Sequence, residues 1–238
     1  MAQVINTNVS ALFAGAALNQ SNNALQTAQQ RLSTGLRINS AKDDATGLVT
    51  ATGYDSQIRG ANQAARNASD GISKAQTNDG YLQQITANLQ RIREIAVQLG
   101  GTASGVETTS LVAENTRINA LTTSTGAVVV NSNGGTVTGI GAPPTIAGLL
   151  TVAGIDSDIT AVSTSRASYG ADAATFGSAV SVLQLQSVNV SASFSRIVDT
   201  DYAAETAAAS KNNILQQAGT AALAQANQNP QSVLSLLR

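Results

Sequence analysis

The clearest structural signal in the chain lies between Ile159 and Ile197, which read ITAVSTSRASYGADAATFGSAVSVLQLQSVNVSASFSRI. Alternate spacings of three and four residues connect a row of mostly apolar side chains along this segment. The row is Ile159, Val162, Arg166, Tyr169, Ala173, Phe176, Val180, Leu183, Ser187, Val190, Phe194 and Ile197. Such an alternation keeps a row on one side of an α-helix and is typical of a coiled-coil seam. The segment therefore predicts a long helix that packs against another helix.

The first hundred residues repeat this spacing in two segments. The first has the row Ala11, Ala14, Leu18, Ser21, Leu25, Ala28 and Leu32, beside a second stripe of Ile5, Val9 and Leu12. Ser33-Thr34-Gly35 predicts its end, and Asn39-Ser40 predicts a cap, with Asp43 and Asp44 in the first turn of the next helix. That helix is expected from about Thr46 to Leu99, with the row Ile58, Ala61, Ala65, Ala68, Ile72 and Ala75. After a slip of phase near Leu82 to Ile85, which resembles a stammer, it continues with Leu82, Ile85, Leu89, Ile92, Ala96 and Leu99.

The middle of the chain differs, because Gly is frequent and short Val-rich runs appear. After a short helix marked by Leu111, Ile118 and Leu121, a β-hairpin is predicted at about residues 127–152, with a third strand at Ile146 to Val152. A last helix, Tyr202 to about Asn227, carries Ile214, Leu215, Ala218 and Ala222. The predicted fold is mainly α, a long coiled-coil helical bundle built from both termini, with a small β-hairpin region in the middle.

The composition excludes several classes of function. The chain has no Cys and no His, so Ser-His-Asp and Cys-His sites cannot form, and we expect no catalytic, metal or cofactor-binding residues. Charged residues make up 11% with a formal net charge of -1, which gives no basic surface for nucleic acid. No apolar run approaches the length of a membrane span, and the start of the chain lacks the pattern of a cleaved signal peptide.

The two terminal segments are rich in Ala, Asn and Gln and poor in large apolar groups. Helix nucleation is costly, so such segments are marginal helices by themselves and depend on packing. We therefore expect them to be largely disordered in a free monomer and to fold as copies add, which couples assembly to ordering. If successive copies meet through different surfaces, the product is an open helical filament rather than a ring.

Several long strings of residues resemble a bacterial flagellin. They include MAQVINTN at residues 1–8, RLSTGLRINSAKDDA at 31–45, RNASDGIS at 66–73, LQRIREIAVQ at 89–98, DTDYA at 199–203 and the run from Ile214 to Arg238. The resemblance covers roughly residues 1–125 and 155–238. It implies that residues 1–42 pair with 199–238 as an inner coiled coil lining the channel of the filament. Residues 43–198 would form a rod domain, and the insert is too short for large outer domains.

By the same resemblance the chain is a structural subunit of the flagellar filament, used for swimming motility. It would be secreted by the flagellar type III apparatus to an extracellular flagellum. Its partners would be copies of itself, an export chaperone, the filament cap and the hook-junction proteins. The residues expected to serve assembly are Leu18, Leu25, Leu32, Ile214, Leu215, Val233, Leu234, Leu236, Leu237 and Arg238.

Five charged or polar residues match the region that in some flagellins contacts both the next subunit and Toll-like receptor 5. They are Arg91, Glu94, Gln98, Glu114 and Arg117, while Ile95 and Gly100-Gly101 depart from the usual pattern. As bare sequence the same stretch also fits a solvated helix face, so subunit contact, receptor contact and plain solvation stay open. Asp43-Asp44 and Asp199-Thr200-Asp201 are interpreted as helix-start and loop caps rather than a cation site.

Three rival classes are weighed against a filament subunit. An enzyme is disfavoured by the absence of His, which a metalloprotease insert would need twice. A displayed binding protein would need an aromatic-lined pocket or a larger insert. A hook-to-filament junction protein would match only weakly at the termini, whereas both termini of this chain match strongly.

Overall fold

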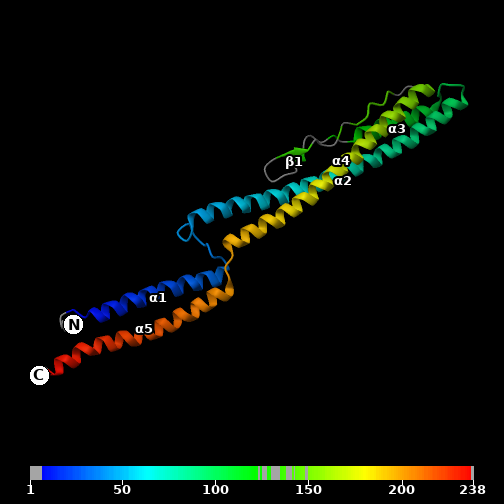
Figure 1. Cartoon of the computed structure of the whole chain (residues 1–238). Helices are drawn as coiled ribbons and strands as arrows, with labels where there is room; N and C mark the ends of the chain where they lie inside the picture. Colours follow the sequence, from blue (N-terminus) through cyan, green and yellow to red (C-terminus); the bar gives the residue numbers. More distant parts are fainter. Residues whose placement is uncertain are drawn as a thin grey trace. The chain divides into compact units, whose positions relative to one another are not determined.

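The computed structural model describes residues 7–122, 124, 128–129, 135–137, 141, 143–147 and 150–236, and gives no side-chain positions at 129, 137 and 229–236. In these ranges the elements follow in the order α1 (Val9–Thr34), α2 (Ala45–Gln98), α3 (Val106–Leu121), β1 (Val128–Val129), β2 (Thr136–Val137), α4 (Val152–Val198) and α5 (Tyr202–Leu236) (Figure 1). The two strands pair antiparallel, with Val128 opposite Val137. This arrangement confirms the predicted mainly α fold and its small hairpin.

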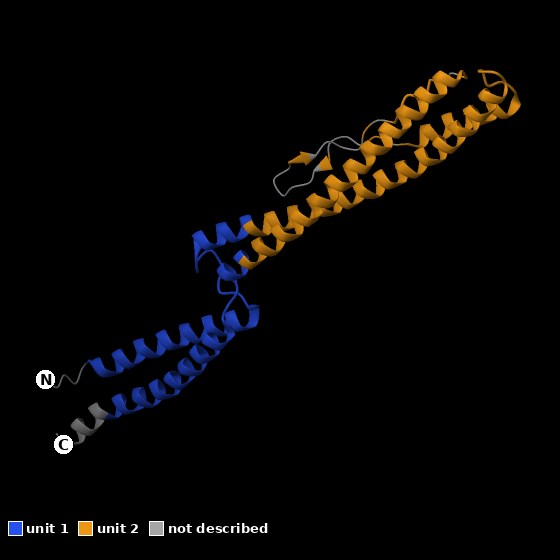
Figure 2. Cartoon of the chain, turned by 45° about the vertical axis from the view of Figure 1, so that its right-hand side comes forward, with its two compact units in different colours: residues 1–53, 193–238 blue, residues 54–192 orange. Residues whose placement is uncertain are grey.

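The chain forms two compact units, and both α2 and α4 contribute to each (Figure 2). Unit 1 consists of residues 1–53 and 193–238, and unit 2 of residues 54–192. The amino-terminal and carboxyl-terminal helices therefore belong to the same unit, although more than a hundred residues separate them along the chain.

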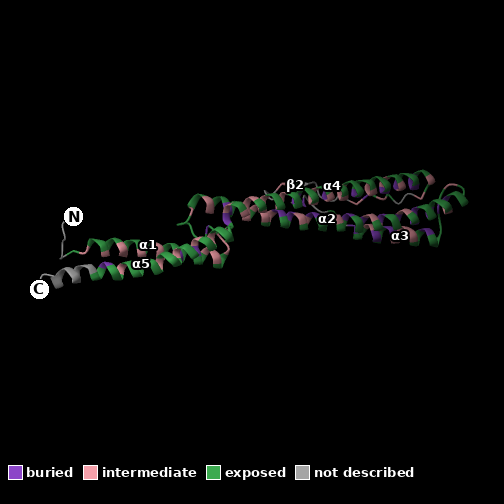
Figure 3. Cartoon of the chain, turned by 60° about the horizontal axis from the view of Figure 1, so that its bottom comes forward, coloured by how far each residue is buried: buried purple, intermediate pink, exposed green. Residues whose placement is uncertain are grey.

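In unit 1, α1 and α5 lie side by side. The row predicted on α1 from Ala11 to Leu32 is buried or half-buried throughout, and Leu25, Ala28 and Ala209 form the buried centre of the contact. Figure 3 shows exposed and half-buried residues alternating along α1. Helix α1 ends where predicted, because Gly35 adopts a φ of 73°, which a residue with a Cβ rarely tolerates.

The start of α2 differs from the prediction in its cap. Asp43 and Asp44 precede the helix, which begins at Ala45. The Asp44 carboxylate accepts a hydrogen bond from the Gly47 N–H at 2.8 Å and so caps the first turn. Asp43 instead closes the preceding turn by accepting from the hydroxyl and N–H of Ser40 and the N–H of Asn39. The Ser40 hydroxyl, followed by the two backbone donors, lowers the pKa of Asp43.

Unit 2 is built on the contact of α2 with α4 and, farther along, with α3. All twelve members of the row predicted on α4 are buried or half-buried, which confirms that row. Tyr169 and Phe176 are its largest fully buried side chains. A Cβ at Gly71 of α2 would lie 3.0 Å from the Phe176 ring, so the absence of a side chain there permits the close approach of the two helices.

On α2 the predicted row is correct except at its end. Leu99 lies beyond the last helical residue, Gln98, and is 53% exposed, because the chain turns at Gly100 and Gly101 with positive φ. Between Ala75 and Leu82 the buried position is Asn78, a polar residue that the apolar pattern did not mark. The predicted slip of phase is therefore wrong, because Ala75, Asn78, Leu82 and Ile85 continue the alternation of three and four.

The predicted third strand from Ile146 to Val152 is wrong in the residues described. Val152 already belongs to α4, and Thr151 makes only an isolated bridge to Thr102. The segment is held by the loop before α3 rather than by the hairpin, since the Ala103 N–H donates to the Leu150 carbonyl at 2.7 Å. Among the described residues of the expected range 127–152, the strands are Val128–Val129 and Thr136–Val137.

Candidate subunit interfaces

The contact between α1 and α5 uses mainly small and polar side chains. On α5 the side turned to α1 carries Glu205, Ala208, Ala209, Asn212, Gln216, Gly219, Leu223 and Ala226, all buried or half-buried. A Cβ added at Gly219 would lie 3.3 Å from Leu18 Cδ1, so the helices come close at this point. Leu18, Leu25 and Leu32 therefore face α5, and they supply most of the large apolar groups of the contact.

Polar interactions define the two ends of this helix pair. At the amino-terminal end of α1, the Asn8 side-chain amide donates to the Ala226 carbonyl of α5 at 2.8 Å. Toward the other end, Arg31 lies 3.6 Å from the carboxylate of Glu205. The Arg37 guanidinium donates twice to the Ile197 carbonyl, at 2.6 and 3.1 Å, where α4 leads toward α5. The relative register of the pair is thus specified at both ends.

Larger apolar side chains of the same helices point away from this contact. Phe13 on α1 is 77% exposed, and Ile214 on α5 is 65% exposed. The same holds for Val9, Leu12 and Leu215, and Ala218 and Ala222 are also exposed. Of the second stripe predicted on α1, Val9 and Leu12 are thus not covered by α5, and Ile5 lies outside the described residues. Exposed apolar side chains that gather into a patch often mark an interaction site, which makes these sides of α1 and α5 candidate interfaces.

The predicted assembly tail at the carboxyl terminus is described only in part. Val233, Leu234 and Leu236 lie in the helical backbone of α5, without described side chains. Leu237 and Arg238 lie outside the described residues.

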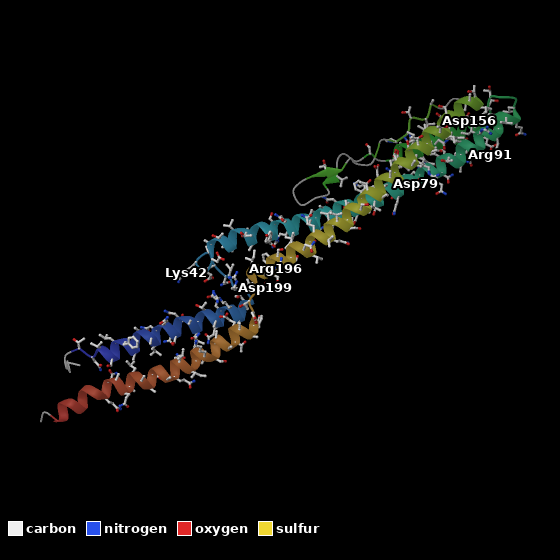
Figure 4. The ribbon with its side chains drawn as sticks, viewed as in Figure 1. Lys42, Asp79, Arg91, Asp156, Arg196 and Asp199 are labelled. Carbon is white, nitrogen blue, oxygen red and sulfur yellow. The ribbon has the colours of Figure 1, made fainter. Side chains whose placement is uncertain are left out.

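Arg91 lies toward the end of α2 in unit 2 (Figure 4), and Glu94 lies one turn farther along the same helix. Arg91 donates through Nη1 to Glu94 at 3.1 Å and through Nε to Glu107 of α3 at 2.9 Å. The hydrogen bond that Arg91 donates to Glu107, followed by the one that it donates to Glu94, raises the pKa of Arg91. All three side chains are more than half exposed, so this ion cluster is accessible in the single chain.

Glu114 and Arg117 form a separate pair on α3. Arg117 donates to both carboxylate oxygens of Glu114, at 2.6 and 2.8 Å, and this contact lowers the pKa of Glu114. Gln98 is exposed in the last turn of α2. The structure thus brings together Arg91 and Glu94, and pairs Glu114 with Arg117.

Two partners in this region were not found from the sequence. Glu107 joins the Arg91 cluster, and its position in the first turn of a helix after Gly105 was a usable signal. Asp156 of α4 accepts from Arg93 Nε at 2.6 Å, and Figure 4 places it at the same end of unit 2 as Arg91. No local pattern predicts that second pair, because 63 residues separate its members.

In the part of the chain that the structure describes, no helix combines the length and apolar character needed to cross a bilayer.

Comparison with known proteins bears on both terminal segments. Residues 5–134 match the model of the bacterial flagellin N-terminal helical region, and residues 152–237 match that of the C-terminal helical region. The chain belongs to the bacterial flagellin family. Together the two matches cover α1 to α3 and α4 to α5, which are the helices that carry the contacts described above.

Some members of the flagellin family are similar over the whole chain and others over about half of it. The flagellar filament 33 kDa core protein of Treponema phagedenis is 38% identical, over 99% of this chain and all of that protein. A flagellin of Xenorhabdus nematophila is 36% identical over the full length of both. A flagellin of Salmonella muenchen is 55% identical over 49% of this chain but only 23% of its own length. This flagellin-family chain is therefore comparable in extent to the first two.

Proposed function

We propose that this chain assembles into the flagellar filament by burying the outward apolar sides of α1 and α5 between copies. As a member of the flagellin family, the chain is a structural subunit of that filament. The observation that carries the proposal is the distribution of side chains. Small and polar groups with a few leucines fill the contact of α1 with α5, whereas Phe13, Leu12 and Ile214 remain exposed. Fully burying a large apolar side chain contributes about 1.5 to 3 kcal/mol, so several per copy favour association strongly.

The proposed subunit has two domains in the filament. Residues 1–42 with 199–238 form the inner coiled coil that lines the channel, and residues 43–198 form the rod domain around it. Support comes from the pairing of α1 with α5 in one unit and from the backbone bridge between Leu36 and Asp199, where the two segments meet. The short insert between the family's terminal regions leaves no room for large outer domains.

The terminal helices are further proposed to become ordered as copies add. Among the described residues of α1 and α5, only Leu25, Ala28, Ala209 and Ala226 are buried. Their area is small against a backbone cost of about 1 to 2 kcal/mol per ordered residue. Amide hydrogen exchange of dilute monomer and of filament tests the idea. Rapid exchange of the α1 amides in monomer and slow exchange in filament is expected, while slow exchange in both would contradict it.

The Arg91 cluster is proposed as a contact with the next subunit. Its exposure in the single chain supports this role, and its fixed geometry gives a directional charged surface. Recognition by Toll-like receptor 5 is the second candidate, supported by the same exposure and by the residues shared with some flagellins. The subunit contact and the receptor contact can be distinguished with the variant Arg91→Ala. Filament growth and receptor signalling are measured on the same preparation of this variant.

Export, location and the remaining partners complete the proposal. The chain would leave the cell through the type III apparatus, with a chaperone on its carboxyl-terminal segment, and would add under the cap beyond the hook-junction proteins. It would act there as a structural protein, and without His or Cys it has neither a Ser-His-Asp nor a Cys-His catalytic site. Separation of sheared surface filaments from cells, followed by mass analysis of the subunit, tests the extracellular location. Subunit found only in the cell fraction would contradict it.

A further inference from the structure

The outward side of α4 in unit 2 carries exposed apolar side chains. Val182, Leu185 and Val188 are 65%, 64% and 65% exposed, and they follow one another at intervals of three residues. Helical periodicity places them opposite the row that contains the buried Phe176 and Leu183. Their exposed neighbours on this side are Ala174, Ser178, Ser181, Asn189 and Ala192. We call this surface the outer α4 face.

The outer α4 face has no charge. Between Asp172 and Arg196 the chain contains no Asp, Glu, Lys or Arg. A helix side that stays in water usually carries charged residues, and the core of a protein interface is depleted of them. The face therefore has the composition of a surface that is covered in the functional state.

The helix that packs against α4 shows the opposite composition on its outward side. Spacings of four and seven place Asp55, Arg59, Arg66, Asp70 and Lys74 on one face of α2, with Arg59, Arg66, Asp70 and Lys74 exposed. This charged α2 stripe lies away from Ala61 and Ala64, which pack against Leu183 of α4. Since both helices belong to one packed pair, the two outer sides differ in composition, one apolar and uncharged and the other charged.

We infer that the outer α4 face is buried against a second copy of the chain in the filament, while the charged α2 stripe remains toward solvent. The inference rests on the assembly proposed above. A second copy is the fitting occupant because every subunit carries the face. Partners at the ends of a filament cover only the terminal copies, so only lateral or axial neighbours can cover it along the whole length.

A unique thiol tests this inference, because the natural chain contains no Cys. Leu185→Cys places a thiol on the outer α4 face, and the matched control Ser73→Cys places one at an exposed position beside the charged α2 stripe. Each full-length variant is labelled with a polyethylene-glycol maleimide, first as monomer and then as filament grown from seeds. Labelling of L185C is expected to be at least about tenfold slower in filament than in monomer, while labelling of S73C stays within about twofold.

Each labelling or assembly result either supports or overturns the inferred contact of the outer α4 face. Equal labelling of L185C in monomer and filament overturns the inference and leaves the assembly proposal intact. If L185C fails to assemble while the unmodified chain and S73C do, with unchanged circular dichroism of the monomer, the face is required for assembly and the inference is supported. Protection of both thiols would contradict the solvent-facing position of the α2 stripe. Failure of the unmodified chain to assemble from seeds would overturn both proposals.

Discussion

The guanidinium of Arg166 on α4 lies against the carboxylate of Asp79 on α2, with Nε donating to Oδ1 at 2.7 Å and Nη2 to Oδ2 at 3.4 Å. Arg166 occupies a position in the seam of α4 where an apolar residue would be expected. The contact with Asp79 raises the pKa of Arg166. The long aliphatic part of the arginine can pack between the helices while its charged end reaches the carboxylate.

Removing either partner of this pair is expected to cost little stability. Asp79→Ala should lower the free energy of unfolding by about 0.5 to 1 kcal/mol, because both side chains remain about one-third or more exposed. A double-mutant cycle with Arg166→Met, followed by thermal unfolding at low and at high salt, measures the coupling. A coupling that is large and insensitive to salt would contradict this account of a partly solvated pair.

Two neighbouring leucines on α4 provide a sharper test of packing. Leu183 is 2% exposed against Ala61 and Ala64, so Leu183→Asp should cost at least about 3 kcal/mol by placing an unpaired charge in the core. Leu185→Asp puts the same charge on the outer α4 face, where the change in monomer stability should stay within about 0.5 kcal/mol. Urea unfolding of both monomers, followed by circular dichroism, measures the difference.

Comparable losses in the two variants would show that α4 does not have the buried and exposed sides described. Loss of assembly in the Leu185→Asp variant with a stable monomer would agree with the inferred contact between copies.

Gly71 tests how closely α2 and α4 approach. A Cβ there would meet the Phe176 ring at 3.0 to 3.2 Å, in a region where both residues are buried. Gly71→Ala is expected to destabilise unit 2 by about 1 to 3 kcal/mol, although alanine favours a helix over glycine. Gly80→Ala is the matched control, because Gly80 also lies on α2 in unit 2 and nothing lies within 4 Å of its added Cβ. Thermal unfolding in which both variants are stabilised alike would show that the helices can move apart freely.

The rows of apolar residues were predictable because each depends only on the local period of a helix. The α4 row from Ile159 to Ile197 and the α1 row are correct at every described position. The sequence also indicated the glycine stops, since a left-handed turn such as that at Gly35 favours glycine regardless of the tertiary fold.

Residues whose role depends on a distant partner were not predictable in the same way. Asn78 fills a core position that the apolar pattern skipped, and Asn88 donates to the buried Asn115 of α3 at 2.8 Å. The prediction of a third strand was wrong because the Leu150 carbonyl accepts a hydrogen bond from the N–H of Ala103, nearly fifty residues earlier. Which side of α5 meets α1 was also not determined by apolar content, since the larger apolar groups Ile214 and Leu215 point outward.

Removal of the apolar carboxyl terminus is expected to stop assembly without unfolding unit 2. A chain that ends at Ser232 lacks Val233 to Arg238 but keeps all residues of unit 2, 54–192. Its thermal unfolding should match that of the full chain, and sedimentation under polymerising conditions should leave it in the supernatant. A truncated chain that pellets like the full-length protein would show that these residues are dispensable for assembly.

Tyr169 predicts how stability depends on alkaline pH. Its side chain is 1% exposed, and burial, followed by the nearby charge of Asp172, raises the pKa of the phenol above 10.0. Because the neutral form is favoured in the folded state, its contribution is complete below pH 10 and is lost as the pH rises through the folded pKa. Tyr169→Phe removes this ionisation, and it loses only a long hydrogen bond of 3.4 Å from the phenol hydroxyl to the Gly141 carbonyl.

The free energy of unfolding, measured in urea between pH 9 and 11.5, should therefore fall less steeply with pH in the variant. Tyr202→Phe is the control, because Tyr202 is 56% exposed and lies in unit 1. Parallel curves for Tyr169→Phe and the unchanged chain would show that the buried phenol does not determine the alkaline limit.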